Sequence, residues 1–236
     1  MKRKAIIIGG SGRVGQALVR ELSALYDTLI IITRTQPRSI SENMHVYHVN
    51  NFDALADTIA SMPIGADTDA FSCLGAAKKD TASQDEFYQV NVLFNIAFAK
   101  ACRDKGVSRF FYLSKAGVES AGKDAELIAK ADVEYYLKTL KFDDVTVFRL
   151  HKLSPAKEKL SLKTAGKLGL NLAKNTIGAI MPFDKTEMLM PKRVAAAMSL
   201  AAYQLNLRSK YRTNEENFHV ISHDKMCAMT EKQTHH

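Results

Sequence analysis

The stretch at residues 4–20, KAIIIGGSGRVGQALVR, decides the fold of this chain. Its four apolar residues at 5–8 predict a short buried strand. Three glycines spaced three residues apart, Gly9, Gly12 and Gly15, follow that strand directly, and apolar residues then recur at helical spacing. The stretch therefore predicts a strand that turns through a glycine-rich loop into a helix.

This loop has the chemistry of a phosphate-binding site. Gly9 and Gly12 permit backbone conformations and close approaches that a Cβ forbids, and Gly15 permits the helix to pack against the strand. The free N–H groups of the first helical turn and the positive end of the helix dipole favour an anion at that point. A tight glycine turn without a ligand is the structural alternative, but the flanking strand and helix favour the phosphate site.

Length and composition are consistent with one α/β domain. The chain has 236 residues, of which 46% are hydrophobic, as expected for a globular protein. Its three cysteines are widely spaced, so we expect neither a disulfide framework nor a metal site. No apolar run has the length of a membrane span, and we expect the cytoplasm as the default location.

A formal net charge of +8 favours anionic partners. Much of the excess lies at residues 152–174, where lysines recur among leucines in a pattern typical of an amphipathic helix. A solvated helix face, an anionic partner and a membrane surface all remain open for this segment. We do not expect nucleic-acid binding, because the lysines are accompanied by no recognisable motif or interleaved aromatic residues. An anionic cofactor explains the charge equally well.

Strands alternate with helices over the first 150 residues. We expect strands at 28–33, 45–49, 69–74, 109–114 and 145–150, and helices at 86–105 and 124–140. This alternation predicts an α/β fold with a doubly wound parallel sheet covered by helices on both faces. After residue 154 we expect a lysine-rich helix, a loop at 181–191, a helix at 192–205 and a strand at 218–221.

We expect a single domain over residues 1–236. Residues 151–236 would form a small lobe of that domain on the substrate side, and residues 226–236 would be a frayed tail. The sequence offers no motif in this lobe that identifies a substrate.

Arg34 stands at the end of the strand expected at 28–33. A carboxylate at that point would accept hydrogen bonds from an adenosine ribose, whereas a cation suits a 2′-phosphate. Arg34 therefore favours NADP(H) over NAD(H), and an ordinary surface arginine is the structural alternative.

Several further segments carry a family resemblance. They are GGSGRVG at 9–15, Asn51 after the third expected strand, CLGAA at 73–77, the run at 90–114 and VFRL at 147–150. Together they resemble the short-chain dehydrogenase/reductase superfamily, and most of all its atypical branch that includes the Tat-interacting-protein oxidoreductases. The resemblance covers about the first 150 residues. It implies an NAD(P)-binding Rossmann fold and an oxidoreductase of a small carbonyl compound or alcohol.

The same branch contains regulatory members. The alternative function is therefore a non-catalytic dinucleotide-binding redox sensor that acts through a protein partner.

The resemblance assigns cofactor contacts to the matched positions. The glycine loop would surround the diphosphate, Asn51 would contact the adenine edge, and Asn91 would lie near the nicotinamide. The whole set is Gly9, Ser11, Gly12, Arg13, Val14, Gly15, Arg34, Asn51, Leu74, Gly75, Ala76 and Asn91. Packing at a strand end for Leu74 and Ala76, and bonding only to backbone for Asn91, are the structural alternatives.

The resemblance also implies a catalytic site from which this chain departs. Family reductases use a serine after the fifth strand and a tyrosine four residues before a lysine. Ser114 and Lys130 match, but the tyrosine position holds Glu126. A carboxylate beside a cation is ionised near neutrality and cannot donate a proton to a developing alkoxide.

The expected catalytic set is therefore Ser114, Lys130 and Glu126, with a non-standard proton donor. An i,i+4 ion pair between Glu126 and Lys130 on a helix surface is the structural alternative. The substitute acids that the sequence offers are Tyr112, Tyr135, Tyr136 and His151.

Overall fold

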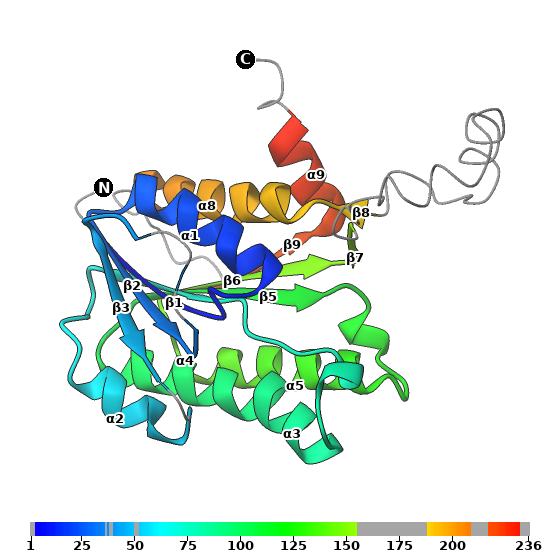
Figure 1. The fold of residues 1–236 in the computed structure, drawn as a ribbon. Helices are drawn as coiled ribbons and strands as arrows, with labels where there is room; N and C mark the ends of the chain where they lie inside the picture. Colours follow the sequence, from blue (N-terminus) through cyan, green and yellow to red (C-terminus); the bar gives the residue numbers. More distant parts are fainter. Residues whose placement is uncertain are drawn as a thin grey trace, which may run out of the picture.

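A parallel β-sheet with helices on both faces forms the centre of the molecule (Figure 1). The computed structural model describes residues 3–35, 37, 40–49, 52–154, 188–208 and 217–231. Within these residues the sheet has seven strands in the order β3-β2-β1-β4-β5-β6-β9. They are β1 (Lys4–Ile8), β2 (Thr28–Thr33), β3 (Met44–His48), β4 (Thr68–Ser72), β5 (Arg109–Lys115), β6 (Asp144–Leu150) and β9 (Phe218–Ser222). Every neighbouring pair is parallel.

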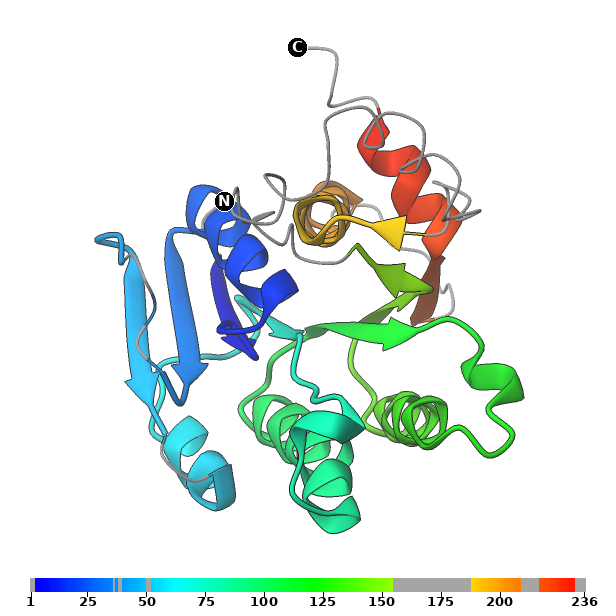
Figure 2. The same ribbon diagram turned by 45° about the vertical axis from the view of Figure 1, so that its right-hand side comes forward.

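The helices form one layer on each face of the sheet, which the turned view separates clearly (Figure 2). One layer contains α1 (Arg13–Leu25), α8 (Pro191–Arg208) and α9 (His223–Glu231). The opposite layer contains α2 (Leu55–Ala60), α3 (Gln84–Tyr88), α4 (Phe94–Asp104) and α5 (Ala125–Thr139). A π-helical turn, η3 (Gln89–Leu93), joins α3 to α4, and short 3-10 turns lie at Phe52–Ala54, Lys78–Asp80 and Val118–Ser120.

Alternation along the strands divides the interior into two cores. In β1, Ile6 and Ile8 belong to the core shared with α2, α4 and α5, whereas Ala5 and Ile7 belong to the core shared with α1 and α8. Because both faces of the sheet are covered, β1 is apolar from Ala5 to Ile8 rather than alternating with polar residues.

A buried ionic cluster lies at the amino-terminal ends of the central strands. Asp69 in β4 is fully buried and accepts hydrogen bonds from Arg109 at 2.6 and 2.5 Å, from Arg3 at 2.6 Å and from the Tyr26 hydroxyl at 2.5 Å. Burial, followed by the charge of Asp69, raises the pKa of Tyr26 far above its usual value. The cluster lies at the end of β4 away from the glycine loop.

The strands and helices expected within the described residues are confirmed to within a few residues. Two expectations were wrong. Residues 226–231 are not frayed, because they belong to α9, where Met226 is fully buried. Of the loop expected at 181–191, residues 181–187 lie outside the described residues, and Met188–Leu189 form a short strand, β8, which pairs in parallel with β7 (Lys152–Leu153). Asn51, most of the lysine-rich segment and the last five residues lie outside the described residues.

None of the described helices combines the length and the apolar character that crossing a bilayer requires.

Candidate functional site

A cavity of about 540 Å³ lies at the carboxyl ends of the central strands. It is lined by the start of α1, by the segment after β4, by the ends of β5 and β6, and by α5. The chain order reverses between β1 and β4 at this edge of the sheet. Ligands of doubly wound sheets bind at such a reversal.

The glycine loop has a different physical reason for each glycine. Gly9 has φ +79°, and a Cβ there would lie 2.5 Å from the Leu74 nitrogen. A Cβ at Gly15 would overlap the Gly9 carbonyl oxygen, so Gly15 permits the helix to pack against the loop. At Gly12 the nearest atom to an added Cβ is the Gly9 oxygen at 3.5 Å, an ordinary contact. The fold itself therefore does not require a glycine at position 12.

The amino terminus of α1 is arranged for an anion. Its N-cap, Gly12, supplies no side-chain cap, and its first turn has no acidic residue. The N–H groups of a first helical turn lack partners within the helix and carry the positive end of the dipole. Arg13 adds a cation there and donates a hydrogen bond to the Ser154 carbonyl.

These features fit the diphosphate of a dinucleotide. Gly12, Arg13, Val14 and Gly15 all line the cavity, and the missing side chain of Gly12 would permit close approach of a phosphate. Ser11 is exposed beside them, and its carbonyl accepts a hydrogen bond from Gln16 at 2.7 Å. The loop predicted from sequence is therefore in the form that a pyrophosphate needs.

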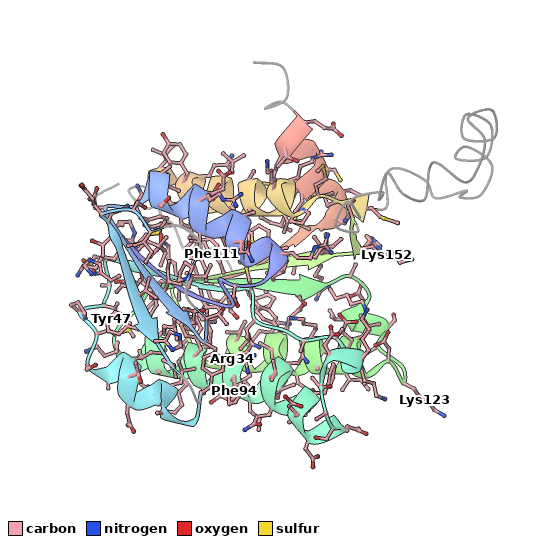
Figure 3. The ribbon with its side chains drawn as sticks, viewed as in Figure 1. Arg34, Tyr47, Phe94, Phe111, Lys123 and Lys152 are labelled. Carbon is pink, nitrogen blue, oxygen red and sulfur yellow. The ribbon has the colours of Figure 1, made fainter. Side chains whose placement is uncertain are left out.

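Arg34 lies at the carboxyl end of β2 and is exposed. Its guanidinium is 5.8 Å from the centroid of the Phe52 ring, and Phe52 packs edge-on against Phe94 with 5.0 Å between the ring centroids. Arg34 and Phe94 are labelled in Figure 3. The aromatic contact restrains the guanidinium at the strand end, on the side of β1 opposite to β4. Asn51, the expected adenine contact, is outside the described residues.

The segment after β4 forms the other wall of the cavity. Leu74, Gly75 and Ala76 line it together with Asn91 from η3. The Asn91 amide accepts from the Ala76 nitrogen at 3.2 Å and donates to the Ala76 carbonyl at 3.0 Å. The Asn91 side chain therefore bonds to the main chain of the cavity wall, which is the structural alternative considered for this residue.

Asn95 is a positioning residue that sequence reasoning missed. It is fully buried, accepts from the Ser72 hydroxyl at 2.5 Å and donates to the Asn91 carbonyl at 3.0 Å. The available signal was a second asparagine four residues after Asn91 in an otherwise apolar helical run. Such a polar residue on a buried helix face needs an internal partner.

Lys130 projects from α5 to the floor of the cavity. Lys130 is 9% exposed. Its Nζ donates a hydrogen bond to the Leu113 carbonyl at 3.1 Å and lies 4.8 Å from the centroid of the Tyr112 ring. Burial lowers the pKa of Lys130 to about 8, against the opposing effect of nearby carboxylates. Burial also raises the pKa of the neighbouring Cys73 thiol to about 12.

Glu126 is paired with a different lysine from the one expected. Its carboxylate accepts from Lys115 at 2.6 Å at the rim of the cavity. The structural alternative, a surface i,i+4 ion pair between Glu126 and Lys130, is not what the structure shows, because Lys130 turns inward under the sheet end while Glu126 stays at the surface. The charge of Glu126 still acts on Lys130, as the largest of the effects that raise its pKa against burial.

Ser114 lines the cavity, but its hydroxyl proton is occupied. It donates to Glu134 at 2.6 Å, and Glu134 in turn pairs with Arg149 at 2.8 Å. Arg149 also pairs with Glu119 at 3.1 Å. Sequence reasoning missed Glu134, whose only signal was its position eight residues after Glu126 on the same helix.

The substitute acids differ in their access to the cavity. Tyr112 is fully buried, and its hydroxyl has no hydrogen-bond partner among the described residues. Tyr135 is 74% exposed. Among the described residues no tyrosine lines the cavity, whereas His151 does so at its exposed rim.

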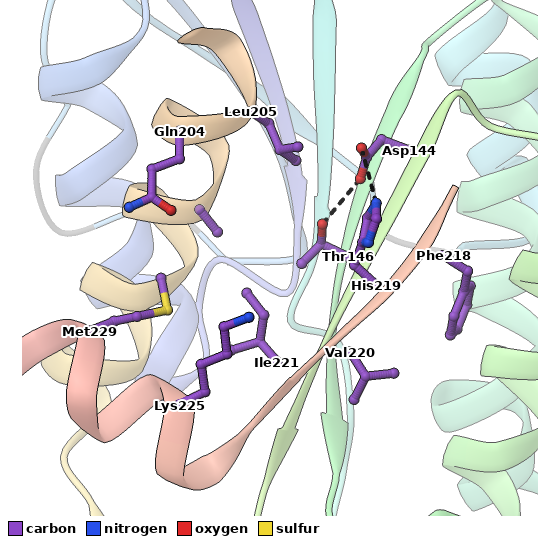
Figure 4. A pocket seen from close by; sticks show the side chains of 11 residues that line it. Asp144, Thr146, Gln204, Leu205, Phe218, His219, Val220, Ile221, Lys225 and Met229 are labelled. Atoms are coloured by element: carbon purple, nitrogen blue, oxygen red, sulfur yellow. Dashed lines mark hydrogen bonds and ion pairs between the residues drawn. The ribbon is translucent and has the colours of Figure 1, made fainter. Parts of the chain in front are cut away.

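A second cavity, of about 410 Å³, lies between β9, α8 and α9 (Figure 4). It contains the buried Asp144, which accepts from Thr146 at 3.2 Å and lies 3.6 Å from His219. Asp144 begins β6, so this cavity opens at the amino-terminal half of the strand. It is therefore separate from the glycine loop and from Lys130.

Comparison with known proteins agrees with this geometry. The family model described as "NAD dependent epimerase/dehydratase family" matches residues 5–172. Rat protein HTATIP2 is 27% identical over 157 residues, which are 63% of this chain and 62% of that protein. The mitochondrial protein FMP52 of Meyerozyma guilliermondii is 26% identical over 149 residues, 62% of this chain and 63% of that protein. The matches thus span less than two thirds of either curated relative.

Solved structures share the fold at low sequence identity. A putative NAD-dependent epimerase/dehydratase from Bacillus halodurans has a TM-score of 0.63 at 16% identity, covering 86% of this chain and 89% of that one. The Bordetella bronchiseptica enzyme WbmH in complex with NAD+ has a TM-score of 0.61 at 13% identity, covering 94% and 86%. The expected Rossmann-type fold is confirmed, and so is the resemblance stated from the sequence. The chain belongs to the NAD dependent epimerase/dehydratase family.

Proposed function

We propose that the protein is an NADP(H)-dependent oxidoreductase that acts on a small carbonyl compound or alcohol through a non-standard active site. The observation that carries this proposal is a single cavity lined both by the phosphate-binding start of α1 and by Ser114, Glu126 and Lys130. When bound, a nicotinamide dinucleotide would exchange a hydride with the substrate carbon. The side chains of the cavity then have to orient the substrate oxygen and move its proton.

The proposed cofactor contacts lie along the carboxyl ends of the strands. Gly9, Ser11, Gly12, Arg13, Val14 and Gly15 would hold the diphosphate. Arg34 would pair with an adenosine 2′-phosphate, since the residue directly after β2 is this exposed arginine and not a carboxylate. Asn51 would contact the adenine, and Leu74, Gly75, Ala76 and Asn91 would border the nicotinamide.

The substrate side of the cavity is formed by the end of β6 and the residues that follow it. Leu150, His151, Lys152 and Leu153 line the cavity beyond the catalytic groups. We propose that residues 151–236 complete this side within one domain, with an unidentified small molecule as substrate and the cytoplasm as location.

One observation favours the non-catalytic redox sensor as a second candidate. Among the described residues no phenol lines the cavity, and the carboxylate at the usual tyrosine position is held by Lys115. A protein with this cavity would bind a dinucleotide without reducing a carbonyl if no other group supplied the proton.

A binding and turnover experiment separates the two candidates. Calorimetry with NADPH and NADH measures cofactor binding, and a panel of benzaldehyde, diacetyl and cyclohexanone tests oxidation of NADPH. Turnover that disappears in Lys130→Ala supports the enzyme. Binding without turnover, together with turnover created by Glu126→Tyr, supports the sensor. If well-folded protein binds neither nucleotide, both candidates are rejected.

A further inference from the structure

The groups that line the cavity differ in whether they can release a proton into it. The Ser114 hydroxyl donates to Glu134 at 2.6 Å, so its proton already forms a hydrogen bond with a buried carboxylate. The Cys73 thiol holds its proton because burial raises its pKa to about 12. Lys115 is tied to Glu126 at 2.6 Å at the rim. None of these three groups is a suitable acid for the interior of the cavity.

Lys130 differs from them in position and in hydrogen bonding. It is the lysine on the cavity floor, and a Cβ added to Gly75 would lie 3.5 Å from its Nζ. An ammonium has three N–H donors, and one of them donates to the Leu113 carbonyl at 3.1 Å. The Tyr112 ring, 4.8 Å from Nζ, stabilises the ammonium through its face without accepting a proton.

We propose that Lys130 is itself the proton donor of the active site, in place of the missing tyrosine. The inference rests on the proposed oxidoreductase function and deepens it. During reduction the carbonyl carbon gains a hydride from a reduced nicotinamide and the C=O π electrons move to oxygen. The Lys130 ammonium gives that oxygen one proton, which leaves an alcohol, an oxidised nicotinamide and a neutral amine. Solvent then reprotonates the amine.

The electrostatic surroundings of Lys130 suit this role. The facing groups are Glu126 and Glu134 on α5, Cys73 after β4, and Tyr112 and Lys115 on β5. Burial lowers the pKa of Lys130 to about 8, while Glu126, Cys73 and Glu134 oppose that change and Lys115 adds to it. An acid with a pKa near the working pH both carries a proton and releases it, which is the condition for efficient general acid catalysis.

The test compares Lys130→Met and Lys130→Arg with a matched control, Lys138→Met. Lys138 lies on the same helix and also has its Nζ over an aromatic ring, 4.7 Å from the centroid of Phe218, but it does not line the cavity. We expect both Lys130 variants to lose about 100-fold or more in kcat for diacetyl reduction, and Lys138→Met to lose none. The arginine variant keeps the charge but has no proton to release near neutrality.

A readout independent of turnover is the lysine Cε chemical shift in protein labelled with carbon-13 lysine and free of cofactor. One resonance should titrate near pH 8 and vanish in Lys130→Met, and kcat for reduction in the unmodified protein should fall as pH rises through the same region. Far-UV circular dichroism and NADPH binding establish that each variant is folded.

The outcomes separate this inference from the proposed function. Loss of NADPH binding by the unmodified protein, or binding without any turnover, rejects the oxidoreductase. Turnover that persists in Lys130→Arg with an unchanged pH profile rejects only the proton donor. A Lys130 resonance that titrates above pH 10 rejects it too.

Discussion

The hydroxyl of Ser114 donates a hydrogen bond to the buried carboxylate of Glu134, with 2.6 Å between Oγ and Oε1. The strand that carries Ser114 is thereby joined to the helix that carries Lys130. Hydrogen bonds to a charged group contribute about 1.5–3 kcal/mol. We therefore expect Ser114→Ala to lower the free energy of unfolding by about 2 kcal/mol, measured by urea denaturation without cofactor.

The matched control for Ser114→Ala is Ser61→Ala. Ser61 also donates through its hydroxyl, to the Thr58 carbonyl at 2.8 Å, but it lies at an exposed helix end. Its substitution should change the unfolding free energy by no more than about 0.5 kcal/mol. Equal effects at the two positions would mean that the Glu134 bond adds nothing to stability.

The glycine loop allows binding and folding to be separated by two similar substitutions. An alanine Cβ at Gly12 has its nearest contact at 3.5 Å, and φ there is −70°, which alanine adopts without strain. We expect Gly12→Ala to change the unfolding free energy by less than about 1 kcal/mol and to weaken NADPH binding about tenfold or more, because the methyl group occupies the diphosphate position. Calorimetry and thermal unfolding measure the two effects.

Gly15→Ala should show the reverse order of effects. Its Cβ would overlap the Gly9 carbonyl oxygen, so the loop and helix must move apart. Overpacking of this kind costs about 1–3 kcal/mol or more. If Gly12→Ala binds NADPH as well as the unmodified protein, the anion does not sit above Gly12.

The sequence was sufficient for the fold because local pattern and global topology agree. The run at 5–8 is apolar without alternation, as expected for a strand buried on both faces, and the glycine spacing is typical of the turn that follows such a strand. Residues next to these patterns, such as Gly75 and Asn91, were predicted to lie near the glycine loop, and both line the same cavity as that loop.

Side-chain partners could not be predicted in the same way. Whether Glu126 pairs with Lys130 or Lys115 depends on how α5 rotates against β5, and helical spacing alone allows both. The position of Glu134 on the same helix as Glu126 did not identify its partners, since Ser114 and Arg149 come from two different strands. Contacts of this kind depend on tertiary packing, which a one-dimensional pattern does not contain.

Arg34 offers a direct test of cofactor preference. Its exposed guanidinium lies over Phe52 at the end of β2, with no carboxylate beside it in the sequence. A charge-assisted bond to a 2′-phosphate is worth about 1.5–3 kcal/mol, so Arg34→Ala should weaken NADPH binding by about 10- to 100-fold. NADH, which lacks that phosphate, should bind nearly as before. Equal losses for both nucleotides would remove the 2′-phosphate role.

The ionic cluster around Asp69 should support the fold without supporting the site. Removing the carboxylate charge leaves Arg109, which is 5% exposed, without its partner. Breaking a buried pair costs about 3–5 kcal/mol. We expect Asp69→Asn to lower the unfolding free energy by about that amount, while the folded variant binds NADPH normally because Asp69 lies at the far end of β4.

The control for Asp69→Asn is Asp67→Asn. Asp67 pairs with Lys4 at 3.3 Å with its side chain 53% exposed. Exposed pairs contribute at most about 1 kcal/mol, so urea denaturation should show little change. A comparable loss at both positions would contradict the importance of burial at Asp69.

Burial of the Lys130 ammonium in the cavity should lower the free energy of unfolding at neutral pH. Its pKa is lowered from 10.5 to about 8 on folding, so between these values the unfolded chain binds more protons than the folded one. Stability therefore rises with pH across that window, and the penalty is fully present below about pH 8. At one pKa unit per 1.4 kcal/mol, the penalty is at most about 3 kcal/mol. Lys130→Met should thus raise the unfolding free energy at pH 7, and the gain should shrink as the pH approaches 10.5. Urea denaturation at pH 7, 8 and 9 measures this trend. A gain in unfolding free energy that stayed constant with pH would mean that folding does not lower the pKa of Lys130.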